Sequence, residues 1–362
     1  MSFQLPKYTP PDFTRDKFIS APDAHIKAVE KDGVAPENYH VMSIYPEYFK
    51  INGKWVLPTQ SRMDCVPVVE KDDSVSVVEF RNLKAGDRVI IGRSEDASEG
   101  IFVYAKGFMQ SENEKEIFAF RQGKSRETSY SKDYDDLYSL LKYEKENNGY
   151  IVWVLGPAVS FDKDAKTAVS SLIKKGYVNA LLAGNALATH DLEGSYLSSA
   201  LGQDIYTGQS YYMGHYNHLD VLNKVREYGS IDKFIKAEKI NDGIMYACHK
   251  YNVPYVLGGS IRDDGPMPEV YGDVYDAQDA MRQHTRKCTT LICLATQLHT
   301  IATGNMTPSY TVVDGNVRNV FIYSVDISEF VVNKLRDRGT LEVNTFVTNV
   351  QDFVVQLDKS LN

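Results

Sequence analysis

The chain has 362 residues, of which 43% are hydrophobic and 24% are charged, an ordinary composition for a globular protein. Its length suggests about two domains. The net charge of −8 argues against wholesale nucleic-acid binding, which needs a basic face. No apolar run approaches the roughly 18 residues of a membrane span, so neither nucleic acid nor a membrane is an expected partner.

The start of the chain and its cysteines indicate a cytoplasmic protein. Residues 1–7 lack the apolar core of a signal peptide. The four cysteines, Cys65, Cys248, Cys288 and Cys293, show no Cys-x-x-Cys pair. We therefore expect reduced, mostly buried thiols and no metal site.

Residues 1–125 are predicted to form a β-rich domain. Residues 74–80 alternate between apolar and polar side chains, and turn residues bound two further strands at 88–92 and 100–104. This pattern suits a small barrel or sandwich. The polar residues 122–132 predict a linker, and a helix is expected from 133 to about 148.

From Tyr150 onward, strands alternate with helices, which predicts a second domain over residues 126–362. Strands are expected at 150–155, 178–183, 253–257, 290–295, 320–325 and 345–350. Helices are expected at 165–175, 231–245 (with a break near 241–243), 274–287 and 328–338, with a last helix at the end of the chain. The alternation is typical of an α/β fold: a parallel sheet with helices on both faces.

Small residues follow several of these strands, and polar side chains lie beside them. Gly156 and Ala158 follow the first strand, Gly184 and Asn185 the second, and Gly259 and Ser260 the third. Ligands of open α/β sheets bind where such strand ends meet helix N-termini. Each turn alone could be a plain connection, but together they indicate a phosphate- or nucleotide-binding crevice. The usual glycine fingerprints of nucleotide sites are missing.

Charged residues and histidines at the same strand ends are candidates for acid–base chemistry. The Arg262-Asp263-Asp264 segment is suited to bind an amino acid or to supply a base, or it forms a solvated loop with an internal ion pair. His190-Asp191 and His299 either contact a ligand or are structural.

The residue that ends the fifth strand, Asp326, offers a carboxylate. It suits a ribose diol or caps the next helix. Motifs for acyl transfer and for zinc hydrolysis are absent from the sequence.

Beyond these patterns, the chain resembles the domain family named after bifunctional lysine-oxoglutarate reductase/saccharopine dehydrogenase proteins. The most specific matches are Ala-Gly-Asn-Ala-Leu-Ala at 183–188 and Gly-Ser-Ile-Arg-Asp-Asp-Gly-Pro at 259–266, with a further block at 294–306. The resemblance covers about residues 40–355 and is least clear over 306–319. The family includes archaeal-type ornithine cyclodeaminases.

The resemblance implies a parallel sheet like that of deoxyhypusine synthase, which binds NAD without the glycine fingerprint. It also implies conversion of L-ornithine to L-proline and ammonia. The residues that it assigns to NAD are Gly156, Ala158, Gly184, Asn185, Gly259, Ser260 and Asp326.

On the substrate side, the resemblance makes Asp263 or Asp264 the base or the ammonium anchor. Arg262 would bind the substrate carboxylate or the cofactor phosphates, and His299 and Asn305 would line the substrate. His190 and Asp191 would touch the ligand or hold Asn185 in place.

Two other functions stay open from the sequence. One is an NAD-dependent amino-acid or opine dehydrogenase with net turnover of NADH, and the other is a non-catalytic nucleotide-binding regulatory protein. The expected partners are a small amino-acid substrate and further copies of the chain, as a dimer or tetramer.

Overall fold

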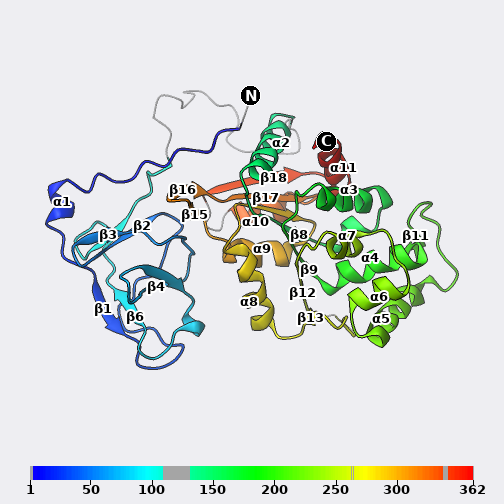
Figure 1. Ribbon diagram of the computed structural model, residues 1–362, viewed down its shortest axis with the longest axis horizontal. Coiled ribbons are helices and arrows are strands. Elements are labelled where there is room, and N and C mark those ends of the chain that lie inside the picture. Colours follow the sequence, from blue (N-terminus) through cyan, green and yellow to red (C-terminus); the bar gives the residue numbers. More distant parts are fainter. Residues whose placement is uncertain (1–2, 109–130, 262, 264, 337–340, 362) are drawn as a thin grey trace.

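The computed structural model describes residues 3–108, 131–261, 263, 265–336 and 341–361. A β-rich N-terminal part (blue and cyan) lies beside a larger α/β part (Figure 1). Residues 122–130 of the predicted linker lie outside the described residues. Its last two residues, 131 and 132, already belong to a helix.

The N-terminal part contains two antiparallel sheets, which confirms that this region is β-rich. One sheet has the order β1-β6-β4-β5 and the other β3-β2-β7. Their bounds are β1 His25–Ala28, β2 Glu47–Ile51, β3 Lys54–Val56, β4 Val66–Val69, β5 Val75–Val78, β6 Arg88–Ile91 and β7 Ile101–Val103, with the short helices α1 Asp16–Ile19 and η1 Phe80–Asn82. Phe49, Ile90 and Ile101 are fully buried in a core that both sheets share.

The α/β part is built on a seven-stranded sheet in which every strand pair is parallel, which confirms the predicted fold class. The strand order is β13 Val270–Tyr271, β12 Tyr255–Gly258, β9 Ala180–Gly184, β8 Ile151–Leu155, β14 Thr290–Leu294, β17 Phe321–Asp326 and β18 Glu342–Val347. The first strand of this sheet along the chain is β8. The strands β9, β12 and β13 are added on one side of it, and β14, β17 and β18 are then added on the other side. The direction of winding therefore reverses between β8 and β14.

Side chains of the central strands alternate between two cores. Trp153 and Leu181 face the core that contains helices α3 and α11, whereas Val152, Val154 and Leu182 face the core that contains Met281 of α8. Both faces of these strands are buried, which explains their continuous apolar sequence.

The helices of the α/β part lie above and below the sheet (Figure 1). Their bounds are α2 Ser131–Glu146, α3 Lys163–Lys174, α4 Asn185–Leu197, α5 Asn217–Tyr228, α6 Ile231–Ala237, α7 Ile244–Lys250, α8 Val274–Thr285, α9 Gln297–Met306, α10 Glu329–Arg336 and α11 Val350–Ser360, with the short helices η3 Pro157–Ser160 and η4 Gly214–Tyr216. The predicted break near 241–243 lies between α6 and α7.

In the α/β part, the sequence did not predict two hairpins, the edge strand β13 and helix α5; the hairpins are β10 Ser199–Ala200 with β11 Gln203–Asp204 and β15 Tyr310–Val313 with β16 Asn316–Asn319. The strands of β10 and β11 are two residues long, too short for a period to show. The β15–β16 hairpin falls in the segment where the family resemblance is least clear.

The β15–β16 hairpin connects the two parts of the molecule. The Val312 N–H donates to the carbonyl of Thr59 (2.9 Å), and the Tyr310 hydroxyl donates to the carbonyl of Pro58 (3.0 Å). On its other strand, Arg318 Nη2 forms an ion pair with Glu144 Oε1 of α2 (2.6 Å). The hairpin is thus bonded to both parts.

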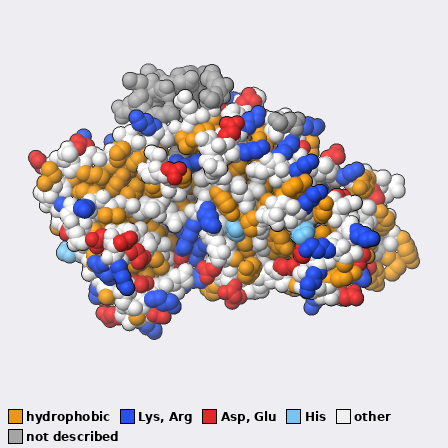
Figure 2. Space-filling model, viewed as in Figure 1, with side chains coloured by type: hydrophobic (Ala, Val, Ile, Leu, Met, Phe, Trp, Pro, Cys, Tyr) orange, Lys and Arg blue, Asp and Glu red, His pale blue; other side chains and the backbone are white. Residues whose placement is uncertain are grey.

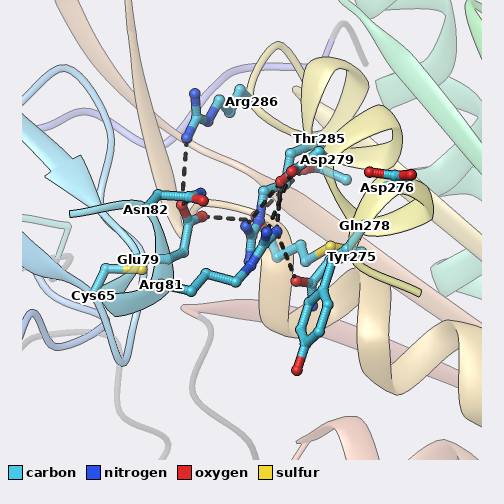
Figure 3. A network of polar contacts seen from close by, with 12 residues as sticks. Cys65, Glu79, Arg81, Asn82, Tyr275, Asp276, Gln278, Asp279, Thr285 and Arg286 are labelled. Carbon is cyan, nitrogen blue, oxygen red and sulfur yellow. Dashed lines mark hydrogen bonds and ion pairs between the residues drawn. The ribbon is translucent and has the colours of Figure 1, made fainter. Parts of the chain in front are cut away.

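A second contact between the parts is a network of charged side chains, shown in Figure 3. Glu79, which is buried, forms ion pairs with Arg282 (2.8 Å) and Arg286 (3.8 Å) of the α8 segment. In return, Arg81 of the N-terminal part forms an ion pair with Asp279 (2.5 Å). Burial, assisted by the neighbouring Arg62 charge, lowers the pKa of Arg282 to about 10.

The surface and the thiols agree with what composition suggested. On the face drawn in Figure 2, basic and acidic side chains are interspersed. All four cysteines are free and buried, and burial raises the pKa of Cys65 to about 11 and that of Cys293 to about 12. In the described part of the chain, no helix has the length and apolar character needed to cross a membrane.

We predict that R318A strongly destabilises the protein. Arg318 is 9% exposed and Glu144 is fully buried, so the substitution leaves a buried carboxylate without its cation. Removal of one partner from such a pair costs about 3–5 kcal/mol. Urea denaturation measures the loss. The matched control is K224A, which breaks the exposed Lys224–Glu227 pair and should leave the free energy of unfolding unchanged. An equally small effect of R318A would contradict the prediction.

Candidate functional site

The carboxyl edge of the parallel sheet brings most of the predicted site residues together. At the point where the winding reverses, the Gly156 N–H donates to the carbonyl of Leu294 (2.8 Å). A Cβ atom on Gly156 would lie 2.0 Å from the carbonyl oxygen of Ala295. Only glycine allows the ends of β8 and β14 to approach this closely. In open α/β sheets such a reversal point is where ligands bind.

Two helices begin at this edge without a side-chain cap. Asp162 caps α3 by accepting from the Ala165 N–H (2.8 Å), and Asp273 caps α8 by accepting from the Tyr275 N–H (2.7 Å). By contrast, Gly184 before α4 and Thr296 before α9 make no capping hydrogen bond through a side chain. The first N–H groups of α4 and α9 therefore suit an anionic ligand such as a phosphate.

His299 lies in the first turn of α9, and its imidazole covers two glycines. Its Cε1 lies 3.0 Å from the position that a Cβ of Gly184 would occupy, and its Nε2 lies 3.7 Å from that of Gly258. The glycines at the ends of β9 and β12 thus make room for the ring. Burial lowers the pKa of His299, and the Asp263 carboxylate opposes this in part. A neutral imidazole at this place is able to accept a proton.

The loop after β12 folds back over the same edge. The Gly259 N–H donates to the carbonyl of Tyr271 (2.9 Å), and the Ser260 N–H donates to Asp263 Oδ2 (2.8 Å). Asn185, at the start of α4, accepts from the Met267 N–H through its side chain (3.1 Å). These bonds position the loop against α4. Arg262 and Asp264 lie outside the described residues.

Exposed apolar side chains surround the edge. Ile261 follows β12, Leu298 lies in the first turn of α9, and Ile327 follows β17; they are 107%, 77% and 64% exposed, respectively. Exposed apolar side chains along one edge of a sheet are suited to a ligand-binding surface.

Two further predicted cofactor residues also lie at this edge. Asp326 ends β17, and its Oδ1 accepts from the Ser328 N–H (2.9 Å), one residue before α10 begins. Ala158 lies in η3, where its carbonyl accepts from Gln351 Nε2 of α11 (2.9 Å). Contact of either residue with a cofactor stays a prediction.

The structure gives Asp191 a different place from the one predicted. Its carboxylate is fully buried and accepts from the N–H groups of Ile244 (2.9 Å) and Met245 (2.8 Å), so it caps α7. Lys166 Nζ lies 3.6 Å from Asp191 Oδ1. Because both oxygens are occupied by backbone groups, the geometry does not support the substrate contact expected for Asp191.

Asn305 is also separated from the carboxyl edge. It lies near the end of α9, about 9 Å along the helix from His299 at 1.5 Å per residue. Its carbonyl accepts from Arg62 Nε of the N-terminal part (3.0 Å). The sequence placed Asn305 beside His299 on the substrate, but the two residues occupy opposite ends of α9.

His190 lies in the second turn of α4. Its Nδ1 is 2.8 Å from Glu193 Oε2, and its ring packs edge-on against Phe161, which follows η3. Sequence reasoning missed Glu193, which is fully buried. The only sequence signal for this pair is the spacing of three residues, which places two side chains on the same helix face.

Comparison with known proteins gives consistent matches. The profile described as "Arginine dihydrolase ArgZ-like, C-terminal, Rossmann fold" matches residues 136–357, and "Arginine dihydrolase ArgZ-like, C-terminal, first region" matches residues 46–131. The ornithine cyclodeaminase of Methanocaldococcus jannaschii is 38% identical over 350 residues, which cover 94% of this chain and 78% of that protein.

Solved structures agree with these matches. The crystal structure of a conserved LOR/SDH protein from Methanococcus maripaludis is 34% identical and has a TM-score of 0.85, covering 94% of this chain and 98% of that one. The ternary complex of AgrE with ornithine and NAD⁺ is 33% identical with a TM-score of 0.59, covering 94% of this chain and 46% of that one. Two profiles and near-full-length relatives confirm the resemblance found in the sequence: this protein belongs to the ArgZ-like C-terminal family, together with proteins named archaeal ornithine cyclodeaminases.

Proposed function

We propose that this protein is an NAD-dependent ornithine cyclodeaminase, which converts L-ornithine to L-proline and ammonia. The relatives that carry this name and the AgrE complex with ornithine and NAD⁺ support the proposal. The observation that carries it is the position of His299. An imidazole with a lowered pKa lies against two glycines, at the edge where α4 and α9 begin without side-chain caps.

The carboxyl edge is suited to NAD in three ways. Gly156, Gly184 and Gly259 let Ala295, the His299 ring and Tyr271, respectively, pack closely against the ends of β8, β9 and β12, which gives the proposed site its shape. The N–H groups of α4 and α9 are suited to the pyrophosphate, and Asp326 to a ribose diol. When bound, NAD accepts a hydride from the substrate and returns it later. Ala158, Asn185 and Ser260 complete the proposed cofactor contacts.

The chain must supply a base and hold the substrate. We assign to His299 the removal of a proton from the α-ammonium of ornithine. Asp263 is the alternative, but its carboxylate already accepts from the Ser260 N–H, and its negative charge lies near the His299 ring. We keep Arg262 for the substrate carboxylate and Asp264 for the substrate ammonium, as the family resemblance implies.

We further propose that the protein works in the cytoplasm as a homo-oligomer, in proline formation from ornithine that arginine breakdown supplies. Its free buried thiols support the compartment. Exposed aromatic side chains on the segment between β11 and α5 support self-association: Tyr206, Tyr211, Tyr212 and Tyr216 are 54%, 41%, 93% and 47% exposed.

The proposed function is tested by incubating the purified protein with NAD⁺ and L-ornithine. Proline and ammonia should form in equal amounts, without accumulation of NADH, because the hydride returns to the cyclic imine. Steady accumulation of NADH would instead identify an amino-acid or opine dehydrogenase. Binding of NAD without turnover of ornithine would indicate a regulatory protein.

The rate should depend on pH as expected for a histidine base with a lowered pKa. Below this pKa the imidazole is protonated and cannot accept a proton, so kcat/KM falls as the pH falls through it. Because burial moves the pKa below the usual 6.5, activity should persist to a more acidic pH than an exposed histidine would allow. H299Q should lower kcat about 100-fold and remove this acid limb. An acid limb at or above pH 6.5 would sink the assignment.

Gly184 should be essential for the placement of His299. In G184A the new Cβ would lie 3.0 Å from Cε1 of the imidazole, which must then move. We expect kcat to fall about tenfold, since small displacements of a catalytic group are costly, while the melting temperature changes little. The matched control is G272A, because no atom lies within 4 Å of the added methyl. Equal activity of both variants would show that the contact does not matter.

A further inference from the structure

Glu193 is a buried carboxylate to which the site described so far gives no role. It lies in α4 with an exposed fraction of 0%, and its Oε2 is 2.8 Å from Nδ1 of His190. Burial of a carboxylate is costly unless specific partners compensate it. Such a group therefore needs an explanation.

Besides His190 of its own helix, Glu193 has a hydrogen-bond partner in another element. The hydroxyl of Ser199 in β10 donates to Glu193 Oε1 (2.7 Å), and Nδ2 of Asn217, the first residue of α5, donates to that hydroxyl (2.8 Å). Both carboxylate oxygens are thus held in place, one by Ser199 and the other by His190. The chain of contacts runs from α5 through β10 to the imidazole on α4.

Asp191, two residues earlier in α4, is also a buried acid, but its hydrogen-bond partners are of a different kind. Asp191 accepts from two backbone N–H groups, so it holds the start of α7. Among the described residues, Glu193 accepts from no backbone N–H, and its hydrogen bonds go to His190 and Ser199. A carboxylate arranged in this way orients an imidazole rather than a helix.

The contact also determines which ring nitrogen carries hydrogen. A carboxylate can only accept, so Nδ1–H of His190 must donate to Glu193. In the neutral ring, Nε2 is then the acceptor, and within the described part of the chain no residue makes a hydrogen bond to it. The side chain keeps 12% of its surface exposed, beside Phe161 in the loop that follows β8. An oriented imidazole with an open Nε2 is the arrangement of a general base.

The proposed reaction requires more proton transfers than His299 alone provides. One base takes a proton from the α-ammonium before hydride leaves Cα. The δ-nitrogen of ornithine is also an ammonium, since alkyl amines have a pKa of about 10. It must lose a proton before it can attack, and the α-nitrogen must gain one before it leaves as ammonia.

We propose that His190 is the second acid–base residue of the reaction and that Glu193 is its positioning residue; this inference rests on the proposed function. Nε2 accepts a proton from the δ-ammonium of ornithine. The resulting amine forms the new C–N bond at the iminium carbon, and solvent then removes a second proton from the δ-nitrogen. The imidazolium then gives its proton to the α-nitrogen. The bond from Cα to the α-nitrogen then breaks with its electron pair on that nitrogen, and ammonia departs. The δ-nitrogen forms the C=N bond of the cyclic imine. No electrons are gained or lost overall in this step.

Three variants of the full-length protein test the proposal, each measured with ornithine and, separately, for NADH binding by fluorescence. H190A should lower kcat about 100-fold with NADH affinity unchanged, and added imidazole should restore part of the rate, which a structural role would not allow. E193Q should lower kcat about tenfold and KM by little, because the ring loses its fixed orientation. The control is H25A, which removes a solvent-exposed histidine in β1 and should keep wild-type rates.

Each outcome bears on one claim. A wild-type protein that makes no proline refutes the proposed function. An active wild type with kcat of H190A within twofold of it refutes the role of His190, and so does a loss that imidazole leaves unchanged while folding is intact. If H190A fails to fold, H190Q decides, because its amide still donates to Glu193 but cannot transfer a proton: a wild-type rate in H190Q refutes the proposal, and a 100-fold loss supports it.

Discussion

The arrangement of the two parts depends on the carboxylate of Glu144. This group is fully buried near the end of α2, and it accepts from both Nη atoms of Arg318 and from the hydroxyls of Thr289 and Thr290. A buried carboxylate is tolerable only when its lone pairs are satisfied. Glu144 therefore holds three segments together: α2, the start of β14 and the hairpin strand β16.

Glu144 also affects the position of the N-terminal part, through the β15–β16 hairpin. The same hairpin that Glu144 holds through Arg318 is bonded to residues 58 and 59 through Tyr310 and Val312. The Glu79 network then makes a second, charged contact with α8 (Figure 3). The β-rich part is thus attached to the α/β part by hydrogen bonds at the hairpin, by arginine–carboxylate pairs at α8, and by Arg62 at the end of α9.

The sequence predicted the parallel sheet and its strand ends well, because these depend on local patterns. Buried strands such as β8 and β14 are continuous apolar runs, and Gly184 marks the end of β9 whatever the tertiary context. The hydrogen bonds that connect His190, Glu193, Ser199 and Asn217 could not be predicted from local patterns. Glu193 finds Ser199 and Asn217 only after the β10–β11 hairpin and α5 have folded back onto α4.

The roles of Asp191 and Asn305 show the same limit. The sequence offered both as ligand contacts, with a structural role left open for Asp191, because each lies in a segment that follows a strand. Asp191 instead caps α7, a helix more than fifty residues later in the chain, and Asn305 lies at the far end of its helix. Proximity along the chain indicates which helix a side chain belongs to, whereas its partners depend on packing between helices.

Helix α9 has a mechanical consequence for the molecule. Its first turn carries His299 at the edge of the sheet, and its last turn is bonded by Arg62 through the Asn305 carbonyl. An α-helix of ten residues is a stiff rod about 15 Å long. Asn305 and His299 are about 9 Å apart along this rod, so a displacement of the Asn305 end of the helix is passed on to the imidazole, and small displacements of a catalytic group are costly. The β-rich part, although its strands lie away from the carboxyl edge, is therefore one of the supports of the helix that carries the proposed base.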